Sequence, residues 1–392
     1  MREVKLDEIF EIARGGSPRP IKKFVTKDPK GVNWIKIGDT TDSKYITKTK
    51  EKIIEEGVSK SRYVEPGDFL LTNSMSFGRP YILKIDGCIH DGWLVLKPKS
   101  DQIFEDYFYY ILGSPVMKRE FKKKAKGTTV KNLNISLVSD VKIPLPSLSE
   151  QKAIVAKLDR AQRLIDIDRE MLAKYDELIQ SVFLEMFGDP VRNEKGWEVK
   201  KLGDIVDKLI AGKSFKSTDD ETGEYRVIKT GAVSWNLFDK LESKPLPPDY
   251  KPPKEHFIDR GDILISRMNT SELVGASVLV QEYVNGYTIP DRIWKVKWKS
   301  KDSQSSNYFW RCINHDSFRN EISKIATGTS GSMKNMSKKK MFNMDVILPP
   351  IDLQKEFDQI CEKIEVQKKN VAKSLKKSEE LFSSLVQGVF GS

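Results

Sequence analysis

The sequence has few cysteines and no long apolar run. Its three cysteines, Cys88, Cys312 and Cys361, lie far apart, and such an odd, sparse set argues against a disulfide framework and for a reducing cytoplasm. No stretch approaches the roughly 18 apolar residues that a membrane span needs. Residues 1–7 also lack the apolar segment of a secretory signal. We therefore expect a cytoplasmic protein that contacts no membrane.

The motifs of enzymes that act on DNA are also missing. Residues 247–250 read Pro-Pro-Asp-Tyr, which is the wrong order for the Asn/Asp-Pro-Pro-aromatic stretch with which a base-amino methyltransferase holds an extruded base. Residues 212–214 imitate the end of a phosphate-binding loop, but Asp207 stands where its first glycine belongs. Asp291 follows Pro290, yet the expected second carboxylate of a metal-dependent nuclease is absent from residues 295–297.

A metal or cofactor site is not indicated either. The three histidines lie near single cysteines at most, and neither local cluster supplies the four ligands of a zinc site. We expect no catalytic site, no metal and no cofactor in this chain, although distant residues can converge in space.

Size and charge indicate two basic globular units. A chain of 392 residues is too long for one ordinary domain. The net charge is +11, while residues 147–188 carry −2 and residues 350–392 carry 0, so the remaining residues carry +13. Positive charge concentrated in this way favours a polyanionic partner.

The second half of the chain repeats the first at an offset near 200. Residues 35–38 match 228–231, residues 67–72 match 261–266, and residues 146–152 match 349–355. The offset drifts from 193 to 203 and then stays at 203 through the last forty residues or so of each half. Each half therefore has a variable globular head and a tail of fixed length.

Each tail is predicted to be a long helix, over 147–188 and over 350–392. Apolar residues recur every seven positions, which is typical of a coiled-coil seam, and polar residues break the stripes at Asp168, Lys368 and Ser378. Short connections then make the two helices antiparallel, unless each packs only on its own head. About 38 residues would span roughly 57 Å, or on the order of fifteen base pairs, and place the heads at opposite ends. The seam residues are Leu158, Ile165, Leu172, Ile179, Cys361, Ile364, Leu375 and Phe382.

The predicted fold is α+β, with two α/β domains in tandem repeat, separated by the two long antiparallel helices of the coiled coil. Short apolar runs at 68–72, 93–96, 262–266 and 293–297 predict strands, and residues 105–112 and 317–326 predict helices. The predicted domains are the first head at 1–146, the first helix at 147–188, the second head at 189–349 and the second helix at 350–392.

Matching loops of the two heads carry the candidate DNA contacts. Small residues, hydroxyls and cations let a loop approach phosphates, and Arg and Asn read guanine and adenine edges. Taken alone, each loop also fits a solvated turn. The candidates are Arg14, Ser17 and Arg19 with Lys213 and Lys216; Asn73, Ser76 and Arg79 with Arg267 and Asn269; and Lys131 and Asn132 with Lys334, Asn335 and Lys338.

The chain resembles the specificity subunit of type I restriction–modification enzymes over its whole length. The resemblance lies in the duplicated heads, the run at 143–152 that opens a long helix, the Gly-Thr-Thr turn at 127–129 and residues 184–188. The second copy departs from it, since Leu353 replaces Glu150. The resemblance implies that each head reads half of a split target in double-stranded DNA. It also implies that the helices set the spacer and bind two methyltransferase (modification) subunits, which carry S-adenosylmethionine. Restriction/translocase subunits that use ATP and Mg²⁺ would join them.

Two other classes of function stay open from the residues alone. One is a nuclease or base-modifying enzyme whose site has no recognisable motif. The other is a protein-binding scaffold in which the coiled coil is the functional part. The +13 charge on the heads favours nucleic acid over protein as the ligand.

Overall fold

The computed structural model describes residues 2–73, 78–124, 133–215, 223–300, 304–328 and 333–391. The chain forms two compact units, Met1–Glu170 with Ala372–Ser392 and Met171–Val371. The division runs through both long helices, so part of each helix belongs to each unit. The predicted division into two heads and two helices stays a prediction, and the core of each compact unit includes segments of both helices.

The first unit contains two five-stranded sheets and a short strand pair. Its α-helices, apart from the long ones, are α1 (Leu6–Ile9), α2 (Glu55–Val58), α3 (Glu105–Gly113), α4 (Pro115–Lys124) and α5 (Ile135–Ser139). The first sheet has the order β2 (Phe10–Arg14), β11 (Trp93–Pro98), β8 (Phe69–Thr72), β9 (Pro80–Leu83) and β5 (Tyr45–Ile46). The second has the order β3 (Val25–Thr26), β6 (Glu51–Ile53), β4 (Val32–Ile35), β10 (Gly87–Ile89) and β7 (Arg62–Val64), and β1 (Glu3–Lys5) pairs with β12 (Lys142–Pro144).

The second unit repeats this plan with shorter sheets. Its short helices are α7 (Leu202–Ile205), α8 (Ser306–Asn314), α9 (Asp316–Ile325) and α10 (Lys338–Phe342). The main sheet has the order β14 (Val206–Ala211), β21 (Ile293–Trp298), β17 (Ile263–Ser266) and β19 (Ser277–Leu279). The other strands form the sheet β16 (Ser243–Pro245), β15 (Arg226–Ile228), β20 (Tyr287–Thr288) and the pairs β13 (Glu198–Lys201) with β23 (Asp345–Leu348) and β18 (Met268–Asn269) with β22 (Lys334–Asn335).

The predicted strands are the central strands of the two main sheets. The runs at 68–72 and 93–96 form β8 and β11, and those at 262–266 and 293–297 form β17 and β21. All four are buried along most of their length, because both faces of each sheet are covered. Helices α3 and α9 occupy the two predicted helical stretches.

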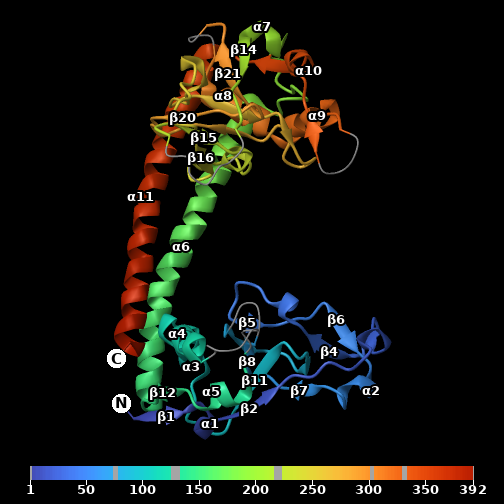
Figure 1. Ribbon diagram of the computed structural model, residues 1–392, viewed down its shortest axis with the longest axis vertical. Coiled ribbons are helices and arrows are strands. Elements are labelled where there is room, and N and C mark those ends of the chain that lie inside the picture. The colour runs from blue at the N-terminus through green and yellow to red at the C-terminus, as the bar shows by residue number, and fades with distance from the viewer. Residues whose placement is uncertain are drawn as a thin grey trace. The chain divides into compact units, whose positions relative to one another are not determined.

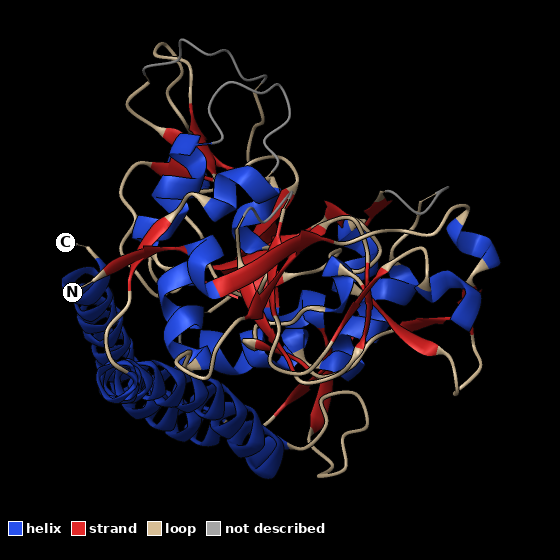
Figure 2. Cartoon of the chain, turned by 90° about the horizontal axis from the view of Figure 1, so that it is seen from below, coloured by secondary structure: helices blue, strands red, loops and turns tan. Residues whose placement is uncertain are grey.

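Helices α6 (Leu148–Phe187) and α11 (Ile351–Phe390) have 40 residues each and are about 60 Å long at 1.5 Å per residue. They run antiparallel, as predicted, and lie side by side (Figures 1 and 2). In the first unit Arg169 donates to Glu379 at 2.8 Å. In the second unit Lys368 donates to Asp176 at 2.6 Å. A salt bridge thus connects the helices in each unit, and the cation comes from α6 in the first unit and from α11 in the second.

The seam between the helices has a polar layer where the stripes are broken. The Ser378 hydroxyl donates to Asp168 at 3.3 Å, and both side chains are buried. Lys368, the third break, makes the salt bridge to Asp176. The seam residues Leu158, Ile165, Ile179, Cys361 and Ile364 are buried, whereas Leu172, Leu375 and Phe382 are half-buried.

The helices also pack on the heads, so the two packing arrangements considered from the sequence coexist. Val155 and Leu158 share the core of the first unit with Val386 and Phe390. Phe183 and Phe187 share the core of the second with Phe357 and Cys361. Each head is therefore rigidly attached to its part of the helix pair.

A buried glutamine fixes the start of each long helix. Gln151 donates to the carbonyls of Gln102 and Pro146 at 3.0 Å each, and accepts from the Phe104 N–H at 2.9 Å. Gln354 makes two of these bonds in the second unit, donating to the Pro349 carbonyl at 2.8 Å and accepting from the Ser305 N–H at 3.0 Å. None of the helices in the described ranges is both long and apolar enough to cross a membrane.

Candidate nucleic-acid interface

In the first head, strand order brings two of the candidate loops to one edge of the main sheet. Strand β11 lies between β2 and β8 and is antiparallel to both, with Leu94 opposite Arg14 and Trp93 opposite Thr72. The ends of β2 and β8 therefore meet at the start of β11. The loop that contains Arg14, Ser17 and Arg19 follows β2, and the loop that begins at Asn73 follows β8. Arg14 and Asn73, where the two loops begin, consequently lie beside the turn at residues 90–92.

Asp91, in that turn, is bonded to residues of both loops. Its carboxylate accepts from the Ser17 hydroxyl at 2.8 Å and lies 3.7 Å from the guanidinium of Arg19. Its backbone carbonyl accepts from Arg14 Nε at 3.2 Å and from the Asn73 side-chain amide at 2.7 Å. The pKa of Asp91 is lowered, first because Ser17 donates to the carboxylate. The group is therefore an anion that holds hydroxyl and cationic side chains around it.

Leu133, which follows the third candidate loop of the first head, is bonded to Asn73. The Leu133 N–H donates to the Asn73 carbonyl at 2.9 Å, so the chain that follows Lys131 and Asn132 is joined to the second loop. Lys131, Asn132 and Ser76 themselves lie outside the described residues.

The second head builds the same edge from different residues. Strand β21 lies between β14 and β17, with Trp294 opposite Ala211 and Ile293 opposite Ser266. The loop with Lys213 follows β14, and Asp291 accepts a hydrogen bond from the Ser214 hydroxyl. The Arg267 N–H donates to the Arg292 carbonyl at 3.0 Å. The equivalents of Ser17 and Asp91 are thus Ser214 and Asp291.

Two predicted pairs of the second head are directly adjacent. Strand β18 pairs with β22, which places Asn269 opposite Lys334 and Met268 opposite Asn335. Within the described ranges, Arg267 Nε and Asn335 Oδ1 are buried and have no hydrogen-bond partner. Asn269 is half-buried, and its amide donates to Ser266 Oγ at 3.4 Å. Arg267 and Asn269 are half-buried, and their side chains are of the types that read guanine and adenine edges.

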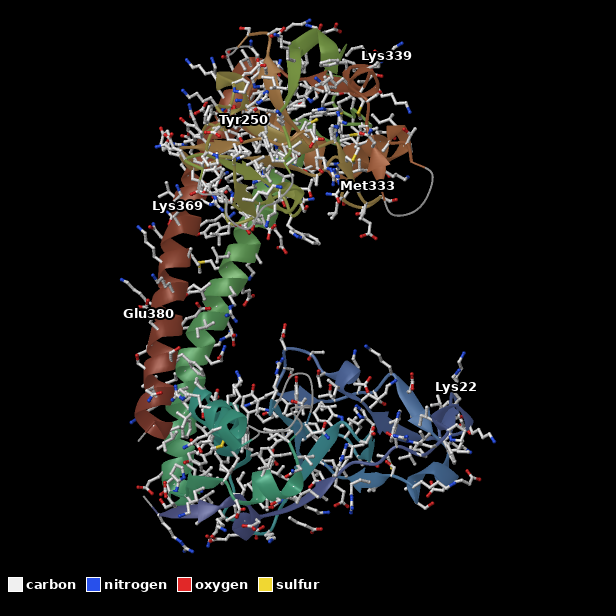
Figure 3. All side chains as sticks on the ribbon, viewed as in Figure 1. Lys22, Tyr250, Met333, Lys339, Lys369 and Glu380 are labelled. Atoms are coloured by element: carbon white, nitrogen blue, oxygen red, sulfur yellow. The ribbon has the colours of Figure 1, made fainter. Side chains whose placement is uncertain are left out.

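An aromatic pair supports Lys213. The rings of Phe215 and Tyr250 lie 4.7 Å apart, and the Lys213 ammonium lies 5.0 Å and 5.2 Å from the two ring centres. Tyr250 projects from the loop that follows β16 (Figure 3). A cation held over two rings keeps its charge at the surface. Lys216 lies outside the described residues.

Three further candidates, Arg79, Lys338 and Asn73, differ from one another in their surroundings. Arg79 points to the Thr41 carbonyl at 3.5 Å and stacks 5.1 Å from the Tyr81 ring, away from Asp91. Lys338 begins α10 and lines a pocket of about 270 Å³ with Asp207 and Glu255. Asn73 is 3% exposed, so its amide supports the loops from within and is not presented at the surface.

Sequence reasoning missed Asp91 and Asp291 as parts of the site. Asp291 was considered only as a nuclease carboxylate, and a motif search along the chain does not pair it with Ser214. The repeat contained the signal, since a Ser stands in the first loop and an Asp stands before the central strand in both halves. Among the described residues, no group of three or more His, Cys, Asp or Glu side chains is arranged to hold a metal ion.

Two similar heads attached to one antiparallel helix pair define a class of repeat-built proteins, and comparison with known proteins identifies the family. The model of the type I restriction modification DNA specificity domain matches residues 1–174 and 194–376. The chain therefore belongs to the family of type I restriction–modification DNA specificity domains.

Curated relatives and solved structures agree with this assignment. The type I restriction enzyme MjaIX specificity subunit of Methanocaldococcus jannaschii is 30% identical over 52% of this chain, but the match spans only half of that subunit. The EcoKI specificity subunit of Escherichia coli K12 is 22% identical over 90% of this chain and 77% of its own length.

The same overall fold occurs in solved structures. A chain from a study of complex assembly and conformational transition of the type I R-M system matches 99% of this chain and 97% of its own length, with a TM-score of 0.62 and 20% identity. The type I restriction–modification S subunit from M. genitalium matches 99% of this chain and 96% of its own, with a TM-score of 0.52 and 14% identity.

Proposed function

We propose that this chain is the DNA sequence-recognition subunit of a type I restriction–modification enzyme and has no catalytic site of its own. The observation that carries the proposal is the duplicated sheet edge, where the ends of two strands and the start of a third gather loops with exposed cations. Each head reads one half of a bipartite target in double-stranded DNA. In this assignment Arg14, Arg19 and Lys213 contact phosphates, and Arg267 and Asn269 contact bases.

The chemistry of modification and cleavage then belongs to other chains. Two modification subunits bind along the helix pair and bring S-adenosylmethionine, and restriction/translocase subunits bring ATP and Mg²⁺. The duplication of the heads and helices supports two equivalent docking positions. The family relationship supports the identity of the partners.

The decisive experiment is sequencing of methylated bases in DNA from cells that express the full chain with and without a type I modification subunit. We expect a two-part motif only when both proteins are present. Methylation by this chain alone would reveal an enzyme. The absence of methylation in every combination would favour a protein-binding scaffold.

A second experiment tests the assigned roles within one head. Replacing Arg267 by Ala should relax the base preference at one half-site by on the order of 10-fold and leave the other half-site unchanged. Replacing Lys213 by Ala should instead weaken binding to all sequences alike and reduce its dependence on salt. Binding of DNA duplexes with altered half-sites, measured at several salt concentrations, separates the two results. If Arg267→Ala gave the uniform loss, Arg267 would be a phosphate contact.

A further inference from the structure

We propose that Asp91 and Asp291 are positioning residues, each of which holds the first loop of its head in the conformation that selects one half-site. Each acts through its paired serine, Ser17 or Ser214, and does not itself contact the bases. The proposal rests on the proposed function and extends it, because it assigns to two carboxylates a role in sequence selection.

The first observation is that Asp91 forms hydrogen bonds with residues of two loops. The Ser17 hydroxyl donates to its carboxylate at 2.8 Å, and the Asp91 N–H donates back to Ser17 Oγ at 3.3 Å. The same residue accepts from Arg14 and Asn73 through its backbone carbonyl. One turn thereby joins the loop after β2 to the loop after β8. Loss of the carboxylate removes the side-chain connection and leaves the backbone ones, so the change is local.

The second observation is that the two heads keep this pair while their neighbouring residues differ. Ser17 is followed by Pro18 and Asp91 by Gly92, but Ser214 is followed by Phe215 and Asp291 by Arg292. Two heads that read different half-sites need different contact residues and the same support. In both heads the serine donates to the aspartate, so the hydrogen bond is kept together with the two residue types.

The third observation is that the carboxylate has the wrong charge for a phosphate contact. Asp91 has a side chain 47% exposed, and Arg19 lies 3.7 Å from it, so the carboxylate partly cancels a nearby positive charge. An anion on a surface that binds a polyanion weakens sequence-independent attraction. Asp91 and Asp291 should therefore affect selective and non-selective binding in opposite directions, which neither a phosphate contact nor a merely structural residue would do.

The test uses the full chain with its modification subunits and compares Asp91→Ala with Asp291→Ala. We expect each variant to lose discrimination at one half-site by on the order of 10-fold, and the two variants to affect different half-sites. Binding to unrelated duplex DNA should become tighter, with a steeper dependence on salt. Asp91→Asn keeps an oxygen that accepts from Ser17. Unlike Asp91→Ala, it should therefore retain most of the discrimination between half-site sequences.

Control variants come from one exposed aspartate in each head. Asp140 forms a salt bridge with Lys5 in the first head, and Asp345 forms one with Lys201 in the second, although the two aspartates stand at different positions of the repeat. Asp140→Ala and Asp345→Ala remove one carboxylate from each head away from the candidate loops. They should leave both half-sites unchanged.

The outcomes separate this proposal from the proposed function. Absence of any two-part motif for the unchanged chain would overturn the proposed function. A normal motif with unchanged selectivity in Asp91→Ala and Asp291→Ala would overturn only the positioning role, as would equal loss of selective and non-selective binding. Hydrogen exchange at the Gly15, Gly16 and Ser17 amides needs no DNA. Exchange there should be faster in Asp91→Ala than in Asp140→Ala, and equal rates would reject the connection between the loops.

Discussion

At the scale of single residues, the starts of the two long helices show why one motif position is kept and its neighbour is not. In the first copy Glu150 accepts from the Ser147 N–H and hydroxyl at 2.8 Å and 2.7 Å, and these bonds lower its pKa. The equivalent of Ser147 is Pro350, which has no N–H to satisfy. Leu353 can therefore replace Glu150 without leaving a donor unpaired, whereas the glutamine that follows is needed in both copies.

Replacing Gln151 or Gln354 by Ala should destabilise the corresponding unit by about 2–4 kcal/mol. Each change leaves a buried N–H and buried carbonyls without partners, and each such group costs roughly 1–3 kcal/mol. Urea denaturation of the full chain measures the effect. Gln162→Ala, which removes an exposed bond to Asp166, is the control. A loss no greater than the control's would show that water replaces the missing bonds.

The segment between α6 and β13 contains a carboxylate that should make stability depend on pH. Burial alone would raise the pKa of Asp189, but bonds from the Arg192 and Val191 N–H groups and from Ser317 outweigh burial and lower the pKa. A lowered carboxylate pKa stabilises the fold above the unfolded value of about 3.9 and loses that effect as pH falls through the folded value. Asp189→Asn should therefore be less stable than the unchanged chain at pH 7, and the difference should be smaller at pH 3, as judged by urea midpoints. A difference of the same size at both values would contradict this.

For single residues, the sequence indicated which residue types matter, but it did not indicate the residues to which they are hydrogen-bonded. The Gln-Lys pair at the helix start was visible as a motif, but the groups that Gln151 bonds, in Gln102 and Phe104, come from a different part of the head. Asp291 was visible too, yet its partner Ser214 lies on another strand's loop. Hydrogen bonds between distant segments depend on strand order, which no local pattern specifies.

At the scale of elements, the two long helices are the part that the sequence predicted best. The predicted ranges 147–188 and 350–392 compare with Leu148–Phe187 and Ile351–Phe390, because a heptad stripe without internal proline is a strong signal. The apolar stripes did not show that the polar residues which interrupt them contact each other. Asp168 and Ser378 looked like separate defects and form one buried polar contact, which favours a single register of the pair.

That polar contact yields a prediction about stability. Ser378→Ala should destabilise the chain by about 1–3 kcal/mol, because it leaves the buried Asp168 carboxylate without this donor. Asp168→Leu combined with Ser378→Ala should recover that loss or exceed it, because apolar side chains then fill the seam. Thermal unfolding measures both variants, and Glu380→Ala, at an exposed position of α11 (Figure 3), is the control. A double variant weaker than the single one would show that Asp168 has a further essential partner.

At the scale of the whole molecule, the tandem repeat made the architecture predictable and the domain boundaries unpredictable. Repetition of the heads and the constant offset of the tails indicated two similar units with a helix after each. The compact units instead divide both helices between Glu170 and Met171 and between Val371 and Ala372. Seam and core contacts between residues about 200 positions apart set this division, and sequence order does not show them.

The proposed spacer role can be tested by changing helix length. Inserting one heptad into α6 alone should leave its added turns unpaired and disturb assembly with modification subunits. Inserting one heptad into both helices restores pairing and should lengthen the preferred spacer by about three base pairs, since seven residues add roughly 10 Å. The methylated motif reports the spacer directly. An unchanged spacer in the double insertion would reject the role.

The shared core of the first unit has a consequence for the order of events in the cell. Val386 and Phe390 are 5% exposed in a core whose other members include Tyr107 and Phe108. Ribosomes add these two residues only after the entire second head has been made. The first head to emerge is therefore among the last to finish folding, and its incomplete apolar surface stays exposed throughout synthesis. A nascent chain of this protein should depend on chaperones at its beginning more than in its middle.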